Sequence, residues 1–308
     1  MMTSPTLLAL LLACQKGAPL PTVQPDDTAA RWDTPPLESG LYTLEHGGLE
    51  RELRLHVPAD LQPGAPLLIV MHGYTSSART IQRYTGFDAI ADAHGFTVVY
   101  PQGTQDRWGQ AFFNVGYDGF DTDVDDRGFV RALVEHLGST LQVDPDAVFA
   151  TGMSNGGDMS YLLACRDADL VQAIAPVAGS MLAHYLDDCA PARRVPVMEV
   201  HGTEDDVTFW AGDMDNTGGW GAYLATEDVM AFWVTHNDLD QLEETQLPDL
   251  DARDDSRVTL RRWWSTEHPE EVRLYGVEGG GHEWPGGFGN AELEASEEIW
   301  GFFEGFVD

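Results

Sequence analysis

The 308-residue sequence predicts an α/β fold, with a doubly wound, mostly parallel sheet, an N-terminal antiparallel hairpin and a small cap-like insertion. Three observations support this prediction. Short apolar runs such as Leu67–Met71 are typical of strands buried on both faces. These runs alternate with segments of helical periodicity, as in parallel β-α-β units. A Gly-x-Ser-x-Gly motif, Gly152-Met153-Ser154-Asn155-Gly156, lies where a predicted strand meets a predicted helix.

Residues 1–14 resemble a bacterial lipoprotein signal peptide. The apolar run 7–13 (LLALLLA) is too short to span a bilayer. Leu11-Leu12-Ala13-Cys14 resembles a lipobox, in which the cysteine is lipidated and becomes the mature N-terminus. No Lys or Arg precedes the run, so a plain cleaved signal and a cytoplasmic start remain alternatives. We expect a secreted or cell-envelope bacterial protein that meets the membrane only through a lipid on Cys14.

Residues 15–40 are rich in Pro, Asp and small side chains, which predicts a flexible, extended tether. The catalytic domain is therefore expected to span 41–308. It opens with a hairpin signal, because predicted strands at 41–45 and 50–57 flank His46-Gly47-Gly48.

The rest of the domain alternates between strand and helix patterns. Strands are expected at 67–71, 96–100, 147–151, 173–177, 195–200, 257–264 and 271–277. Helices are expected at 87–94, about 130–141, 155–165, 226–236 and 291–306. The regularity weakens over 207–256, which we interpret as an insertion that caps the C-terminal edge of the sheet. The sequence shows no internal repeat.

The net charge of the chain limits the kinds of molecule that it can bind. Asp and Glu number 51 against 17 Lys and Arg, for a formal net charge of −34, and the single lysine is Lys16. Such a field repels phosphate backbones and anionic lipid heads, so no nucleic acid partner is expected. A surface of this kind suits high salt, where screening removes self-repulsion, or simply a very soluble secreted protein. We expect a monomer.

Ser154 lies at the tip of the predicted turn between strand 147–151 and helix 155–165. A serine hydroxyl becomes a strong nucleophile when it is held beside a base, with N–H groups aimed at the oxyanion it creates. Gly152 and Gly156 lack side chains that would separate strand and helix. Because the chain holds 32 glycines, a glycine-rich loop with an idle serine is the alternative.

A base is expected later in the chain, because hydrolases with this serine turn supply their triad in the order Ser, Asp or Glu, His. His282 follows a predicted strand in the glycine-dense loop 279–287, where backbone freedom can bring the ring over the sheet edge. His236, in a predicted helix, and His268, in a polar turn, are interpreted as solvated. His282 is therefore the predicted base.

The acid is expected at the end of the strand 195–200. That strand runs into Glu204, Asp205 and Asp206. One carboxylate has to accept from the imidazole N–H that faces away from the serine, which holds the tautomer and stabilises the imidazolium. Position alone leaves Asp205 and Asp206 open.

The oxyanion hole needs two N–H donors. One is expected from Asn155, which follows the nucleophile, and the other from Tyr74 or Thr75, in the segment after Leu67–Met71. His72, in the same segment, is interpreted as a structural hydrogen-bonding residue rather than a proton shuttle.

Several motifs occur in an order that resembles a known family. The chain is similar, over about residues 41–306, to the secreted esterase family of poly(3-hydroxybutyrate) depolymerases and feruloyl or acetylxylan esterases. The motifs are HG at 72–73, VDDRGF at 124–129, VDP and ATGMSNGG within 143–157, APVAG at 175–179, RVPV at 194–197, HGTED at 201–205 and GGGHEWPGG at 279–287.

The resemblance implies an α/β-hydrolase fold and the triad Ser154, Asp205 and His282, which favours Asp205 over its neighbour. It also implies that Cys165 and Cys189 pair, where the residues alone leave two free thiols as an alternative. The chain departs from the family at Tyr74, where Gly or Cys is common. It departs again at 206–208, which lacks the usual proline, so the mouth of the site is expected to differ.

Four tryptophans are candidates for substrate binding, although each of them could instead serve packing. Trp284 lies beside the predicted base, and Trp108, Trp210 and Trp220 lie in loops expected to rim the sheet edge. Together they could form an aromatic cleft for a feruloyl ring, a sugar or a polyester segment.

The acidic segment 121–125 (DTDVD) has the alternating carboxylates of a calcium loop. Asp126 stands where that loop requires Gly, and Ala132 where it requires a bidentate Glu. We therefore interpret it as a solvated loop that caps the following helix, and we expect no metal and no cofactor.

The sequence predicts a secreted serine carboxylesterase that acts through an acyl-enzyme on small or oligomeric esters. Hydroxycinnamoyl or acetyl esters of plant polysaccharide and short hydroxyalkanoate esters are close rivals as substrates, and polyhydroxybutyrate depolymerisation is a further alternative. A serine peptidase is a lesser alternative. From another class, the chain could be a non-catalytic surface-binding lipoprotein on a hydrolase scaffold, but no triad member is missing.

Overall fold

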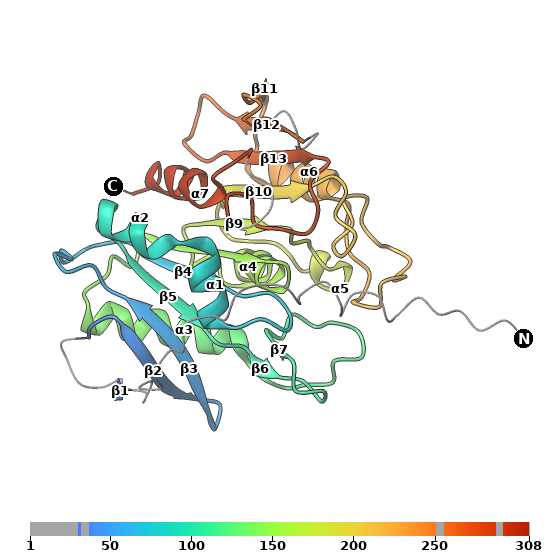
Figure 1. Cartoon of the computed structure of the whole chain (residues 1–308). Coiled ribbons are helices and arrows are strands. Elements are labelled where there is room, and N and C mark those ends of the chain that lie inside the picture. Colours follow the sequence, from blue (N-terminus) through green and yellow to red (C-terminus); the bar gives the residue numbers. More distant parts are fainter. Residues whose placement is uncertain (1–29, 32–36, 251–255, 288–291, 308) are drawn as a thin grey trace, which may run out of the picture.

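A large mixed sheet forms the centre of the molecule (Figure 1). The computed structural model describes residues 30–31, 37–250, 256–287 and 292–307. Within these residues one sheet has the strand order β1 (Ala30–Arg31), β2 (Gly40–His46), β3 (Leu49–His56), β5 (Thr97–Pro101), β4 (Leu67–Met71), β8 (Val148–Met153), β9 (Ala173–Val177), β10 (Val197–Gly202), β13 (Val272–Glu278), β12 (Arg257–Trp264) and β11 (Gln241–Gln246). Neighbours from β5 to β13 in this order pair in parallel, and β2, β3, β12 and β11 add antiparallel pairs at the two sides.

Helices cover both faces of this sheet. One hydrophobic core lies between the sheet and α3 (Asp126–Thr140), α4 (Asn155–Arg166) and α6 (Thr226–His236). The other lies beneath α1 (Ala78–Thr85), α2 (Phe87–His94) and α7 (Ala295–Glu304). Strand β4 serves both: Leu67, Ile69 and Met71 enter the first core, and Leu68 and Val70 the second, because successive side chains of a strand point to opposite faces. The doubly wound sheet with its N-terminal hairpin is confirmed.

Helix α1 was not anticipated from the sequence. Its apolar content is low, and only Ala78, Ile81 and Thr85 are buried. Ser77 caps its start by accepting from the Thr80 N–H, and Gly86, with φ 67°, ends it and precedes α2. Short elements also lie in regions expected to be irregular: β6 (Thr104–Gln105), β7 (Ala111–Phe112) and α5 (Ala183–Leu186).

The expected insertion over 207–256 is narrower in the structure. Helix α6 lies within this range but packs into the core beside β13, and β11 adds a strand to the main sheet by pairing antiparallel with β12. The irregular part that remains is 207–225. Sequence regularity was a poor guide because all six residues of β11 are exposed, so this strand lacks an apolar face.

The N-terminal expectations fall mostly outside the described residues, including the signal peptide at 1–14 and the lipidation site Cys14. Part of the predicted tether is ordered in the sheet: β1 pairs in parallel with β2, and Leu37 is buried. The folded domain thus begins earlier than position 41.

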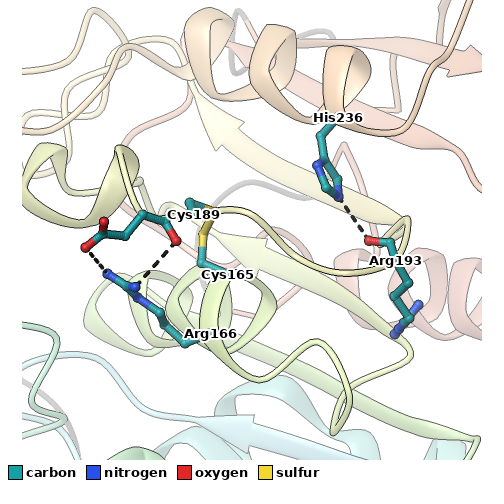
Figure 2. Close-up of a disulfide and its surroundings, with 6 residues drawn as sticks. Cys165, Arg166, Cys189, Arg193 and His236 are labelled. Carbon is teal, nitrogen blue, oxygen red and sulfur yellow. Dashed lines mark hydrogen bonds and ion pairs between the residues drawn. A yellow bond between two sulfur atoms is a disulfide. The ribbon is translucent and has the colours of Figure 1, made fainter.

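A disulfide joins Cys165, near the end of α4, to Cys189 after α5 (Figure 2). Next to it Arg166 pairs with the carboxylate of Asp188 at 3.2 Å. His236, at the end of α6, donates a hydrogen bond from Nε2 to the Arg193 carbonyl at 3.0 Å (Figure 2). The expected cysteine pairing is confirmed, and this bridge ties the helix behind the nucleophile to the following segment.

Candidate active site

The turn that carries Ser154 is held in a strained conformation. Ser154, between β8 and α4, has φ 54° and ψ −120°, a region that residues with a side chain rarely occupy. Two backbone bonds fix it: its N–H donates to Val177 O at 2.9 Å, and its carbonyl accepts from the Asp158 N–H at 2.8 Å. A Cβ at Gly156 would lie 2.2 Å from Met71 O, so only glycine allows this approach of helix and strand. The turn therefore presents the serine side chain beyond the sheet edge.

Asp205 and His282 form a hydrogen-bonded pair at the same edge. Asp205 Oδ2 lies 2.8 Å from His282 Nδ1, and the Asp205 side chain is fully buried. Its other oxygen, Oδ1, accepts from the backbone N–H groups of Val207 and Thr208, each at 2.8 Å. Asp206 is exposed, so the structure distinguishes the two aspartates that position alone left open. Because the carboxylate accepts, the neutral ring carries its proton on Nδ1 and leaves Nε2 with a lone pair.

Ser154 and His282 line one cavity of about 250 Å³. Among the described residues their side chains make no hydrogen bond to each other. Such bonds are often long before substrate binds and tighten in the Michaelis complex. Aromatic and apolar groups complete the walls, notably Tyr74, Tyr117, Trp220, Tyr223, Leu182 and Val207.

Backbone hydrogen bonds distinguish the residues that are candidates for the oxyanion hole. The Thr75 N–H donates to Ala111 O at 2.9 Å and is therefore engaged. No hydrogen bond of the Tyr74 N–H is found within the described part of the chain, so of the two candidates Tyr74 has the N–H that is not engaged by the backbone. Asn155 is the first residue of α4, where the N–H has no intrahelical partner. Its side chain clamps both backbone groups of Phe113, at 2.7 and 2.9 Å, which fixes its position.

Only one of the four predicted binding tryptophans, Trp220, lines the cavity. The prediction is wrong for Trp284, which is 1% exposed, packs against Phe87 and donates from Nε1 to the Ser296 hydroxyl. Trp284 is only two residues from His282 in the sequence, but residues this close in a loop can point in opposite directions, so sequence proximity did not predict its position. Trp210 packs edge-on against the His201 ring, with centroids 5.8 Å apart, and Trp108 lies in a neighbouring hollow, half exposed.

Asp158 is a cavity residue that sequence reasoning missed. It lies one helical turn after Ser154, so both face the same cavity, and this spacing is the signal that could have revealed it. Its carboxyl accepts from the Tyr117 hydroxyl at 2.5 Å and from the Ser180 N–H at 2.8 Å. Burial raises the pKa of Asp158 from 3.8 to about 7. A carboxyl that titrates near neutrality therefore stands beside the nucleophile.

His72 has the structural role expected for it. Its Nε2 accepts from the Gly103 N–H at 3.0 Å, and its Nδ1 lies 2.8 Å from Gly73 O, to which it donates. Burial lowers its pKa to about 4, so the ring stays neutral at physiological pH. It thereby braces the segment that carries Tyr74.

The acidic segment before α3 serves as a helix cap. The Asp125 side chain accepts from the Gly128 N–H at 2.8 Å and so caps the start of α3, as the interpretation of a helix-capping loop predicted. No group of three or more His, Cys, Asp or Glu side chains that could hold a metal ion occurs among the described residues. Within the same residues no helix is long and apolar enough to cross a membrane.

The chain is similar to known esterases. Residues 52–242 match the family described as Esterase PHB depolymerase. NocK of Nocardia uniformis subsp. tsuyamanensis, provisionally named an esterase, is 29% identical over 290 residues, which cover 88% of this chain and 83% of NocK. Feruloyl esterase B of Piromyces equi is 36% identical over 152 residues, covering 49% of this chain and 28% of that protein.

The fold has solved counterparts. The acetyl xylan esterase from Aspergillus awamori superposes with a TM-score of 0.59 at 14% identity, covering 86% of this chain and 99% of that one. At that identity the likeness establishes the α/β-hydrolase fold, while the family match rests on sequence. The chain belongs to the Esterase PHB depolymerase family, and it is a carboxylic ester hydrolase.

Proposed function

We propose that the protein is a serine esterase in which Ser154, His282 and Asp205 form the triad. The observation that carries the proposal is the 2.8 Å bond between His282 and a buried Asp205, at the mouth of the cavity that Ser154 lines. That bond directs Nε2, the basic nitrogen, away from Asp205, which is the arrangement a serine nucleophile needs.

In the proposed reaction the Ser154 hydroxyl attacks the ester carbonyl, and His282 Nε2 takes its proton. The N–H groups of Tyr74 and Asn155 stabilise the oxyanion, each by roughly 3 kcal/mol in the transition state. The imidazolium returns its proton to the departing alkoxide, which leaves as the alcohol and gives the acyl-enzyme. Water, deprotonated by His282, then releases the acid and restores Ser154.

The walls of the cavity support substrates that combine an apolar body with a hydroxyl group. Aromatic surface is provided by Tyr74, Tyr117 and Trp220. The centroid of the Trp220 ring lies 5.2 Å from that of Tyr74 and 5.3 Å from that of Tyr117. Asp158 keeps lone pairs beyond the two hydrogen bonds it accepts, and these can receive a substrate hydroxyl. Hydroxycinnamoyl esters and short hydroxyalkanoate esters both have these features, and acetyl esters of sugars carry the hydroxyls on the leaving half.

Hydrolysis of p-nitrophenyl acetate by the wild type and by Ser154→Ala tests the proposed mechanism. We expect the variant to lose activity by a factor of about 10⁴ or more. Equal rates would remove the triad assignment. Methyl ferulate, acetylated xylan oligosaccharides and 3-hydroxybutyrate oligomers, compared by kcat/KM, then separate the candidate substrates, and a chromogenic peptide anilide tests the peptidase alternative.

We also propose that the protein acts outside the cytoplasm. The Cys165–Cys189 bridge supports this, because structural disulfides persist mainly in oxidising compartments. Cell fractionation after labelling with radioactive palmitate tests both export and lipidation. An exported protein is recovered in the envelope or the medium, and Cys14→Ala abolishes labelling if this cysteine is lipidated. Recovery of unlabelled protein in the cytoplasm would contradict the proposal.

A further inference from the structure

Behind the triad acid lies a buried polar group that the proposed mechanism does not use. Glu199 and His201 both come from β10, two residues apart, so their side chains share one face of the sheet. Both side chains are almost completely buried, at 1% and 0% exposure. Burying a carboxylate and an imidazole is costly unless they are paired. The sheet interior thus holds a polar pair directly upstream of Asp205.

The contacts of His201 fix where its protons are. Its Nε2 lies 2.8 Å from the Thr208 carbonyl, which can only accept, so Nε2 carries a hydrogen. Its Nδ1 lies 2.9 Å from Glu199 Oε1, so the second proton lies between these two atoms. The Tyr161 hydroxyl, from α4, donates to Glu199 Oε2 at 2.7 Å. Burial raises the pKa of Glu199, and the hydrogen bonds from His201 and Tyr161 oppose that rise by favouring the carboxylate form.

Electrostatics favours the imidazolium. Burial alone lowers the pKa of His201, but the hydrogen bond and negative charge of Glu199 outweigh burial, and the pKa of His201 is raised. The other charged or titratable groups near the pair are Asp205, on the loop after β10, and Asp158 with Tyr161, on α4. The Trp210 ring covers another side of His201 and carries no charge.

His201 also reaches the triad. Its Nε2 lies 3.5 Å from Asp205 Oδ2, the same oxygen that lies 2.8 Å from His282 Nδ1. Asp205 therefore stands between two imidazoles. One is the proposed base, at the cavity, and the other is buried and held by Glu199.

We propose that His201, held by Glu199, is a positioning residue that fixes the Asp205 carboxylate toward His282 and offsets part of the negative charge that His282 faces. This inference rests on the proposed triad. A cation beside Asp205 offsets part of the negative field that this carboxylate exerts on His282. Through Thr208, which lines the cavity, His201 also fixes one wall of the site.

The test compares Glu199→Gln with Tyr161→Phe. Glu199→Gln keeps the shape of the side chain and removes its charge, so His201 becomes neutral. Tyr161→Phe removes a hydrogen bond from the same carboxylate and leaves the charges in place. For each variant kcat/KM toward p-nitrophenyl acetate is measured from pH 4.5 to 9, together with the melting temperature.

For Glu199→Gln we expect the acid limb of the profile to move up by about one pH unit, because His282 then feels the full charge of Asp205. For Tyr161→Phe we expect a lower melting temperature and an unshifted acid limb. An unshifted limb in Glu199→Gln, or an equal shift in both variants, would overturn the inference. Activity of Ser154→Ala equal to that of the wild type would instead overturn the triad itself, so the two failures are distinguishable.

A measurement on the wild type keeps the inference testable if Glu199→Gln does not fold. In protein labelled with ¹⁵N-histidine, we expect both ring nitrogens of His201 to show imidazolium shifts between pH 5 and its ordinary pKa of about 6.5. A single neutral tautomer at His201 in this range would contradict the inference.

Discussion

At the scale of single residues, three strained backbone positions lie around the proposed site, and three others lie elsewhere in the described residues. Thr75, Ser154 and Ala178 all have positive φ, at 68°, 54° and 50°. Each such residue costs about 1–3 kcal/mol and persists only where its surroundings hold it. Backbone hydrogen bonds do so here, for example from the Ala178 N–H to Val200 O at 2.9 Å. Strain at these positions is what turns the serine and the oxyanion segment toward the cavity.

Asp205→Asn should lower kcat by roughly 10²–10⁴-fold, because the amide oxygen is held by the Val207 and Thr208 N–H groups, which turns the uncharged NH2 toward His282 Nδ1 and favours the wrong tautomer. Asp206→Asn is the matched control: it removes the same charge one residue away, from an exposed side chain, and should leave kcat within about twofold. Steady-state kinetics with p-nitrophenyl butyrate checks both. Equal losses in the two variants would contradict the assignment of Asp205.

Asp158→Asn should change how stability depends on pH. Because the pKa of Asp158 is about 7 in the folded protein and 3.8 is its ordinary value, the folded state binds the proton more tightly. Its contribution to the free energy of unfolding is therefore complete below about pH 4 and is lost as the pH rises toward 7, by an amount on the order of 4 kcal/mol.

Asn cannot ionise, so the melting temperature of Asp158→Asn relative to the wild type should rise steadily from pH 4 to pH 8. Differential scanning calorimetry across this range measures the difference. A difference that stays constant with pH would show that Asp158 is already ionised at low pH in the folded protein.

At the scale of elements, the disulfide links α4 to the segment before β10. In the chain-entropy description, closing a loop across a sequence separation of 24 stabilises the fold by about 3 kcal/mol. The double variant Cys165→Ser/Cys189→Ser should therefore melt roughly 6–12 °C lower. Thermal denaturation under non-reducing conditions measures this, and a melting temperature equal to that of the wild type would show that the bridge contributes nothing.

Elements with a strong apolar signal were predictable from sequence, and their neighbours with a weak signal were not. Strand β4 and helices α2 and α6 have the predicted bounds, because their apolar residues are continuous or spaced at helical intervals. Helix α1 and strand β11 were missed, since one has few apolar residues and the other is wholly exposed.

The site also contains residues that could be predicted from the sequence and residues that could not. Ser154 and His282 follow from motifs whose geometry is local, so their positions could be read from the sequence. The choice of Tyr74 over Thr75 depends on a bond to Ala111, and the burial of Trp284 depends on α2. Both are contacts between segments far apart in the chain, which a single sequence does not display.

At the scale of the whole molecule, the net charge of −34 at neutral pH should make stability depend on salt. Repulsion among exposed carboxylates is screened as the Debye length falls from about 30 Å at 0.01 M to about 3 Å at 1 M. The melting temperature should therefore rise when NaCl is increased over this range, and a melting curve at each concentration checks it. A melting temperature that falls or stays flat would mean that attractive ion pairs dominate the surface.

Among the described residues, β11 is the edge strand at one side of the sheet, and all six of its residues are exposed. Glu243 and Glu244 stand there opposite Arg262 and Arg261 on β12. An approaching second copy would bring its own acidic edge, so like charges would meet before any ladder could form. We therefore expect these carboxylates to protect the edge from intermolecular strand pairing, and we expect replacement of both by valine to make the protein aggregate.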